Sequence, residues 1–293
     1  MEKLIKRVAE DTLMFSVRQM CEEDIEFAVQ ITDTMNWNLT EWDFKFMMSL
    51  EPEGCFILLY DSSKIGIATT ISFGKVGWIG SVIVDENHRG KGAGSMLVKH
   101  AMGYLKSRGV ETIGLYSYKK NVKFYMRLGF KRETEFTVLK GESLPSQFQE
   151  KSVKTTEKGE LQKVIAFDTF HFGASRRKLL EKIANIRGNL CYHYIEEREI
   201  LGYAMAKVYN HYAEIGPLVC LERHLEAAEA LLKTLLNKLR GFEVSMVVSG
   251  KEEKLLKMLL ENGFSAEFNV VRMFSKPLAF KDCIYIAESL ERG

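Results

Sequence analysis

Residues 82–97, the most informative segment of the chain, read Val82-Ile83-Val84-Asp85-Glu86-Asn87-His88-Arg89-Gly90-Lys91-Gly92-Ala93-Gly94-Ser95-Met96-Leu97. The β-branched apolar run at its start predicts a buried strand, and a short polar turn follows. Beyond the turn, Leu97, Ala101 and Leu105 recur at helical spacing, which predicts an amphipathic helix. The chain therefore passes from a strand into a helix through a loop rich in glycine.

This glycine loop, residues 89–95, has the composition of an anion-binding site. Glycines in the pattern Arg89-x-x-Gly92-x-Gly94 let the main chain approach a ligand closely. Main-chain N–H groups and the N-terminus of the helix form a concave site that favours negative charge. Arg89 and Lys91 add positive charge, so we predict that the loop binds a pyrophosphate.

Two common phosphate-binding loops do not fit this segment. A Walker loop requires Gly-x4-Gly-Lys-Ser/Thr, but here Lys91 precedes the last glycines. A dinucleotide-binding loop requires Gly-x-Gly-x-x-Gly, and Ser95 or Leu97 stands where the third glycine would be. The loop therefore binds another class of phosphate-containing ligand, or it is a glycine-rich turn without a ligand.

The glycine loop resembles the Arg-x-x-Gly-x-Gly/Ala loop of the GNAT acetyltransferases. A second segment, residues 121–130, resembles the GNAT segment in which a short helix carries a Tyr and ends at Gly-Phe before the next strand. In this chain the Tyr is Tyr125, and the segment ends at Gly129 and Phe130. Both motifs occur in the expected order, and the chain is similar to GNAT superfamily N-acetyltransferases on these grounds.

Composition limits the remaining possibilities. The 293 residues are 46% hydrophobic and 27% charged with a net charge of +2, which predicts a globular protein and gives no reason to expect nucleic acid or a membrane as partner. The charged first ten residues do not look like a signal peptide. Five dispersed cysteines predict free thiols and a cytoplasmic location, and the six histidines show no metal-ligand spacing.

The chain also contains an internal repeat. Identical residues recur at a constant offset of 136 positions: Ser152 matches Ser16, Cys191 matches Cys55, and Ile215 matches Ile79. We therefore predict an α/β fold of two tandem GNAT-like domains, at residues 1–143 and 144–293, each with a mixed, mostly antiparallel sheet flanked by helices. A strand at residues 136–139 closes the first half. The second half also resembles the second domain of two-domain GNAT proteins at residues 172–176 and 215–218.

The second copy has lost the glycine loop. The same offset places Leu225, Ala228 and Ala230 where the first half has Arg89, Gly92 and Gly94. Glu226 and Glu229 in this segment would repel a pyrophosphate. We expect one acyl-CoA site, in the first half, and a structural or substrate-cleft role for the second half.

The resemblance implies transfer of the acetyl group of acetyl-CoA to a primary amine. It implies that the strand at Val82, Ile83 and Val84 pairs with the pantetheine arm, and that an amide near Ile83 or Val84 polarises the thioester carbonyl. It implies Tyr125 as proton donor to the leaving thiolate, or alternatively only as a packing residue. The residues expected to contact coenzyme A are Val82, Ile83, Val84, Arg89, Gly90, Lys91, Gly92, Ala93, Gly94, Ser95, Asn121, Phe124 and Tyr125. GNAT proteins often place the Asn seven residues before the Tyr, whereas Asn121 lies four before Tyr125.

The acceptor is less well defined by the sequence. No carboxylate lies within the strand before the loop, and Asp85, just beyond it, is either an acceptor contact or a turn residue. Trp37, Trp42 and Trp78 could line a pocket for a cationic amine or belong to the core. We expect a small-molecule or peptide amine acceptor, no metal, and a monomer or homodimer. The alternative function is a non-catalytic acyl-CoA sensor; a transferase acting on protein amino termini or lysines also remains open.

Overall fold

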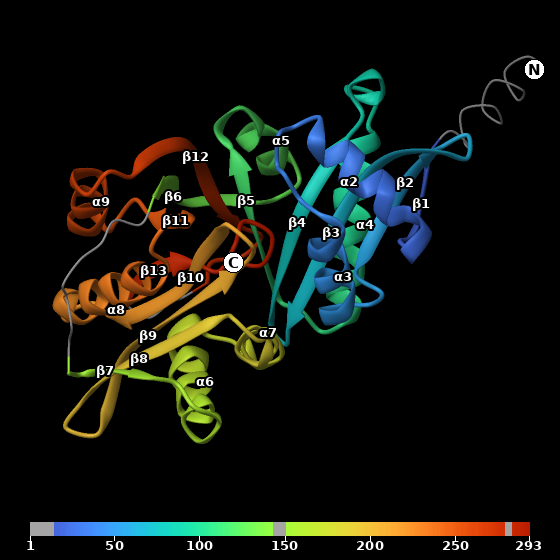
Figure 1. The fold of residues 1–293 in the computed structure, drawn as a ribbon. Helices are drawn as coiled ribbons and strands as arrows, with labels where there is room; N and C mark the ends of the chain where they lie inside the picture. The colour runs from blue at the N-terminus through green and yellow to red at the C-terminus, as the bar shows by residue number, and fades with distance from the viewer. Residues whose placement is uncertain (1–14, 143–150, 279–282) are drawn as a thin grey trace, which may run out of the picture. The chain divides into compact units, whose positions relative to one another are not determined.

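The computed structural model describes residues 15–142, 151–278 and 283–293 (Figure 1). Close contacts divide the chain into two compact units, the first ending at Ile113 and the second beginning at Gly114, with Arg292 assigned to the first and Gly293 to the second. The domain boundary predicted between residues 143 and 144 lies outside the described residues, as does the charged amino terminus. That boundary therefore stays a prediction.

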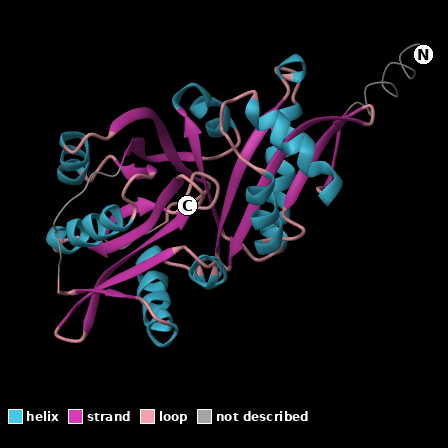
Figure 2. Ribbon diagram, in the orientation of Figure 1, coloured by secondary structure: helices cyan, strands magenta, loops and turns pink. Residues whose placement is uncertain are grey.

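The first unit is an antiparallel sheet with helices on both faces. Its strands follow one another in space in the order β1-β2-β3-β4. The strands and helices are β1 (Phe15–Gln19), η1 (Glu22–Asp24), α2 (Ile25–Asp33), α3 (Glu41–Leu50), β2 (Cys55–Tyr60), β3 (Ser63–Phe73), β4 (Val76–Val84), η2 (Glu86–His88) and α4 (Ala93–Ser107). In Figure 2 these strands are magenta and the helices beside them cyan.

Side-chain alternation along the strands explains this arrangement. Ile57, Ile67 and Ile83 form a core with residues of α2 and α3 on one face of the sheet. Phe56, the neighbour of Ile57, points to the other face and lies against the ring of His100 on α4. The apolar face predicted for α4 is confirmed, because Leu97, Ala101 and Leu105 are fully buried.

Local sequence signals explain two helix boundaries. Asp43 accepts hydrogen bonds from the amide and hydroxyl of Thr40 at 2.8 and 2.7 Å, so this pair forms the capping box that opens α3. Gly109, with φ of 81°, follows the end of α4 at Ser107. A left-handed conformation at this position is the usual way to terminate a helix.

The second unit contains a larger, mostly antiparallel sheet. Its strand order is β5-β12-β6-β11-β13-β10-β9-β8-β7. The elements are β5 (Thr112–Tyr118), η3 (Lys119–Asn121), α5 (Val122–Arg127), β6 (Lys131–Glu142), β7 (Val153–Thr155), α6 (Lys158–Phe172), α7 (Arg177–Asn185), β8 (Leu190–Glu196), β9 (Glu199–Val208), β10 (Tyr212–Leu221), α8 (Leu225–Lys238), β11 (Glu243–Ser249), α9 (Glu253–Glu261), β12 (Ser265–Phe274) and β13 (Cys283–Ala287). Apart from the additional strand β13, the second half repeats the strand and helix order of the first.

The two halves exchange strands within this sheet. Val270 of β12 is paired with Tyr118 of β5 on one side and with Phe136 of β6 on the other. Phe136 is in turn paired with Ser249 of β11. A strand from the second half therefore lies between two strands of the first half. The strand predicted at residues 136–139 is longer than expected, Lys131–Glu142, because it pairs along both of its edges.

Candidate active site

The end of β4 is irregular in a way that the sequence did not predict. Ile83 is paired with Ile67 of β3, but Gly80 is paired with Thr69, so β4 carries one extra residue between these two pairs. Ser81 lies in this bulge with φ of 48°, a left-handed conformation that is rare for residues other than glycine. Bulges often re-aim strands beside active sites. The local sequence around Ser81 does not predict the bulge, because the bulge arises from pairing with β3.

Hydrogen bonding at the end of β4 determines which amide faces away from β3. The amide of Asp85 donates to the carbonyl oxygen of Ile65 on β3 at 2.7 Å. Successive residues of an antiparallel strand point their amides to opposite edges, so the Val84 amide and carbonyl face the other edge. The Val84 carbonyl accepts a hydrogen bond of 2.7 Å from Nε of Arg89. Of the two amides considered from the sequence, Val84 rather than Ile83 is directed to this edge.

Asp85 is occupied within the turn that follows. Its carboxylate accepts a hydrogen bond from the Asn87 amide and lies 3.0 Å from Nδ1 of His88. The hydrogen bond with His88 lowers the pKa of Asp85. Asp85 therefore caps the short η2 helix, and a carboxylate with a lowered pKa is a weak base.

The glycine loop adopts a conformation suited to binding an anion. Gly90 and Gly92 have φ of 77° and 90°, and a Cβ added at either would meet nothing within 4 Å. The glycines are thus required by the backbone conformation and not by close neighbours. Gly92 precedes α4, whose first intrahelical bond runs from the Met96 amide to the Gly92 carbonyl oxygen at 3.0 Å.

The start of α4 therefore leaves donors directed outward. The amides of Ala93, Gly94 and Ser95 precede the first intrahelical bond and lack helical acceptors by geometry. The first turn of this helix contains no acidic residue. Arg89 and Lys91 are exposed beside it, and Nζ of Lys91 donates to the Asn87 carbonyl oxygen at 3.1 Å. Positive charge and free main-chain donors are thus combined at one helix N-terminus.

The other predicted site residues, Asn121, Phe124 and Tyr125, belong to the second unit. Asn121 is exposed immediately before α5, and Phe124 is half-buried. Tyr125 is 7% exposed and packs edge-on against Phe124 and Phe130, with ring centroids 4.9 and 6.0 Å apart. Burial raises the pKa of Tyr125, so its phenol keeps its proton at neutral pH.

The tryptophans differ in their surroundings. Trp78 on β4 is fully buried, so it presents no surface to an acceptor and belongs to the core, the alternative that the sequence left open. Trp37 is half-buried and packs against the core beneath α2 and α3. Trp42 is 39% exposed and stacks on Phe46 at a centroid distance of 5.0 Å. The exposure of each tryptophan depends on which strands and helices pack beside it. The periodicity of the sequence alone does not reveal these neighbours.

The corresponding region of the second half differs from the first. Helix α8 begins at Leu225, and Ala228 and Ala230 are buried where the first half has exposed or half-buried glycines. Glu226 pairs with His224 at 3.0 Å in its first turn. The irregularity of β10 lies between Ile215 and Leu218 and includes Pro217, which has no amide to donate.

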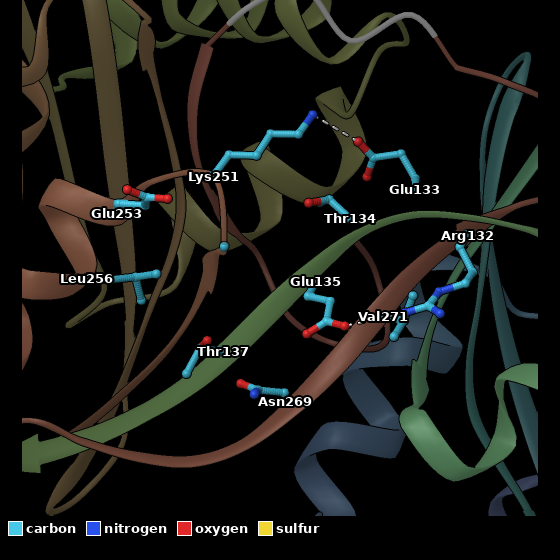
Figure 3. A pocket seen from close by; sticks show the side chains of 11 residues that line it. Arg132, Glu133, Thr134, Glu135, Thr137, Lys251, Glu253, Leu256, Asn269 and Val271 are labelled. Carbon is cyan, nitrogen blue, oxygen red and sulfur yellow. Dashed lines mark hydrogen bonds and ion pairs between the residues drawn. The ribbon is translucent and has the colours of Figure 1, made fainter.

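A hollow of about 660 Å³ lies in the second unit, and none of the site residues predicted from the sequence lines it (Figure 3). Its lining comes from β6, β12, α9 and the turn that precedes α9. The lining residues are Arg132, Glu133, Thr134, Glu135, Thr137, Gly250, Lys251, Glu253, Leu256, Asn269 and Val271. Glu133 is paired with Lys251 at 3.3 Å and with Arg272 at 2.7 Å, so its charge is already compensated.

Two kinds of feature are absent from the described residues. Within residues 15–142, 151–278 and 283–293, no group of three or more His, Cys, Asp or Glu side chains is placed to hold a metal ion. No helix in the same part of the chain is long and apolar enough to cross a membrane.

Comparison with known proteins identifies related sequences for both halves. The model of the Acetyltransferase (GNAT) family matches residues 17–130, and a model of an Acetyltransferase (GNAT) domain matches residues 164–283. An uncharacterized N-acetyltransferase of Methanocaldococcus jannaschii is 31% identical over 110 residues, covering 34% of this chain and 47% of that protein. An uncharacterized N-acetyltransferase of Bacillus subtilis is 31% identical over 85 residues, covering 28% and 34%. The matched region spans less than half the length of these curated relatives.

Solved structures share the fold over most of the chain. A protein from Pyrococcus horikoshii, assigned as an acetyltransferase, has a TM-score of 0.78 and 21% identity, with 95% of this chain and 96% of that chain covered. A tandem GNAT protein from the clavulanic acid biosynthesis pathway has a TM-score of 0.60 and 13% identity, with 90% and 100% covered. At these identities the likeness concerns the fold. The two family matches together take in well over half of the residues, and the chain belongs to the GNAT acetyltransferase family with one such domain in each half.

Proposed function

We propose that this protein is an N-acetyltransferase that transfers the acetyl group of acetyl-CoA to a primary amine by direct attack in a ternary complex. The observation that carries the proposal is the junction of β4 and α4, where a bulged strand edge leads into an exposed glycine loop at a helix N-terminus. Family membership of both halves supports the same class of reaction. The second half supplies a scaffold or part of the acceptor cleft.

Each part of the acyl carrier has a suitable partner in the first half. The pyrophosphate would accept hydrogen bonds from the amides at the start of α4 and from the side chains of Arg89 and Lys91. The amide-rich pantetheine arm would pair with the edge of β4 as an added strand does. The Val84 amide would donate to the thioester oxygen as negative charge develops there, and such a donor typically contributes about 10² to 10³ in rate.

Proton transfers must balance the bond changes. The amine nitrogen forms a bond to the acetyl carbon while the carbon–sulfur bond breaks, and the leaving thiolate must be protonated. We assign this proton to the Tyr125 phenol, which is then reprotonated from water. Asn121 and Phe124 are proposed coenzyme A contacts on the basis of the family motif.

The proton lost by the attacking amine also needs an acceptor. Asp85 is engaged in its own turn and has a lowered pKa. Ser81, 6% exposed in the β4 bulge, has a side-chain oxygen with no hydrogen-bond partner among the described residues. Buried hydroxyls are generally satisfied by protein or ordered water. We therefore assign Ser81 as the anchor of a water molecule that receives this proton, and expect Ser81→Gly to lower kcat/KM about tenfold with unchanged CoA affinity.

The proposal is tested by measuring released thiol while the protein is incubated with acetyl-CoA and a panel of small and peptide amines. Gly92→Glu should abolish both CoA binding and thiol release, because it places a side chain and a negative charge in the glycine loop. Gly74→Glu is the matched control, since Gly74 has φ of 80° and equally open surroundings but lies in the turn between β3 and β4. CoA binding without thiol release from any amine would instead support a sensor, and absence of CoA binding would reject both functions.

A further inference from the structure

Strands β10 and β11 of the second half begin as neighbours and then separate. They run parallel and are paired from Tyr212 with Glu243 to Ile215 with Met246. After this point β10 turns through its irregularity at Ile215–Leu218, and no further pairing between the two strands follows in the described residues. Parallel strands that separate in this way leave a slot with an unpaired edge on each side.

The last strand of the sheet fills that slot. β13 runs antiparallel to both neighbours and pairs with β10 from Leu218 with Ile286 to Leu221 with Cys283. On its other edge, β13 pairs with β11 through Val247 and Val248. Figure 1 places β13 beside β10 and β11. Both exposed edges are thereby satisfied by the protein's own backbone.

The positions that β13 covers correspond to the proposed carrier-binding edge of the first half. At the offset of 136 residues, Leu218, Val219 and Cys220 correspond to Val82, Ile83 and Val84. Building on the proposed function of the first half, we propose that β13 is a built-in substitute for the acyl-carrier arm and closes the equivalent slot of the second half. The protein then binds one acyl carrier per chain for two reasons: the second half lacks the glycine loop, and its slot is already occupied.

Buried contacts hold β13 in the slot. Ile284 and Ile286 are at most 2% exposed and belong to the core formed with α8. The Tyr285 hydroxyl accepts a hydrogen bond of 3.1 Å from Arg176, and Arg176 is held 2.6 Å from Asp168 in a fully buried ion pair. A strand fixed by burial on one face and a buried polar contact on the other is not an exchangeable ligand.

A glycine makes the close approach of β13 possible. A Cβ added at Gly216 of β10 would lie 2.1 Å from the carbonyl oxygen of Ala287, much closer than any real contact. Substitution of Gly216 therefore acts on the seating of β13, because the three atoms nearest to the added Cβ belong to Ala287 and Glu288. Gly159, at the start of α6, has open surroundings and serves as the matched position for a control substitution.

The test is hydrogen exchange on the full-length protein, with and without saturating acetyl-CoA, combined with calorimetric stoichiometry. We expect β13 to be strongly protected and unchanged by acetyl-CoA, the segment at residues 82–97 to gain protection, and one carrier to bind per chain. Gly216→Ala should accelerate exchange of β13 by about tenfold or more, with Gly159→Ala unchanged and CoA affinity within about twofold. If Gly216→Ala does not fold, Tyr285→Phe removes only the hydroxyl contact and should still accelerate exchange measurably.

The proposal would be overturned by two carriers bound per chain, by β13 exchanging at the rate of an unstructured peptide, or by faster exchange of β13 when acetyl-CoA is added. Unchanged exchange of β13 in a folded Gly216→Ala protein would also contradict it. Failure of the proposed function has a different signature, because acetyl-CoA would then fail to bind while the protection of β13 and its loss in Gly216→Ala remained.

Discussion

Nε of Arg89 donates a hydrogen bond of 2.7 Å to the carbonyl oxygen of Val84. This contact joins the first residue of the glycine loop to the strand edge proposed to hold the pantetheine arm. Arg89 remains exposed, so its guanidinium can still face an anion while Nε is engaged. The glycine loop and the strand edge are thus fixed relative to each other by one side chain.

Replacing Arg89 should weaken carrier binding through both of its roles. Arg89→Met removes the hydrogen bond and the positive charge, and we expect the Kd for CoA to rise about tenfold, or about 1.4 kcal/mol. Arg89→Lys retains the charge but loses Nε, so its Kd for CoA should lie between those of the wild-type and Arg89→Met proteins. Calorimetry at low and high salt provides the measurement, and the Arg89→Met protein should show the weaker salt dependence. Equal Kd values for all three proteins would contradict this role.

Tyr125→Phe separates proton donation from packing. The ring remains in place, so CoA affinity and thermal stability should be nearly unchanged, while kcat should fall by about 10² or more if the phenol protonates the thiolate. Because burial raises the pKa of Tyr125, the protonated form persists to higher pH than in an exposed tyrosine. The wild-type kcat should therefore show no loss attributable to this group up to about pH 9.

Tyr118→Phe is a suitable comparison, since Tyr118 lies on β5 with its ring 5.3 Å from that of Phe268. Its kcat should match that of the wild-type protein. A Tyr125→Phe protein with full turnover would show that Tyr125 only packs.

Asp24 should make the stability of the first unit sensitive to acid. Its carboxylate is 1% exposed, binds Arg18 at 2.5 Å and Lys64 at 2.6 Å, and the hydrogen bond from Arg18 is the main cause of its strongly lowered pKa. Because the pKa of Asp24 is lower in the folded than in the unfolded protein, its ionised carboxylate stabilises the fold above the unfolded-state pKa of about 4. This contribution is lost progressively as the pH falls below that value. Asp24→Asn should cost about 1–3 kcal/mol in the free energy of unfolding at pH 7.

Urea denaturation at pH 7 and near pH 3 measures this effect. The difference in free energy of unfolding between the wild-type and Asp24→Asn proteins should shrink at the lower pH. Asp33→Asn, at an exposed position on α2, should leave the urea denaturation curves at both pH values nearly unchanged. A difference that grows on acidification would have the wrong sign.

The strand exchange predicts that the first half cannot be isolated as a stable monomer. In a chain of residues 1–142, β5 would lose its partner β12, and β6 would lose both β12 and β11. Exposed strand edges promote self-association. Light scattering of this fragment should reveal oligomers or aggregates, and co-expression with residues 151–293 should restore a one-to-one complex. A monodisperse, folded monomer of residues 1–142 would contradict the exchange.

The sequence by itself determined the features that depend on residues close together in the chain. The passage from β4 through the glycine loop into α4 follows from the apolar run, the glycines and the spacing of Leu97, Ala101 and Leu105. The capping box at Thr40 and the repeat between the halves are likewise readable, because they need only side-chain chemistry and order.

Only the tertiary structure decided how distant strands pair. Pairing with β3 creates the bulge at Ser81 and turns the Val84 amide, rather than that of Ile83, to the edge; neighbouring strands and helices also bury Trp78. β12 lies between β5 and β6, and β13 enters the slot between β10 and β11, although no local pattern marks either strand for its place. The physical reason is that backbone hydrogen bonding is common to all residues, so the choice of partner depends on which edges the complete fold brings together.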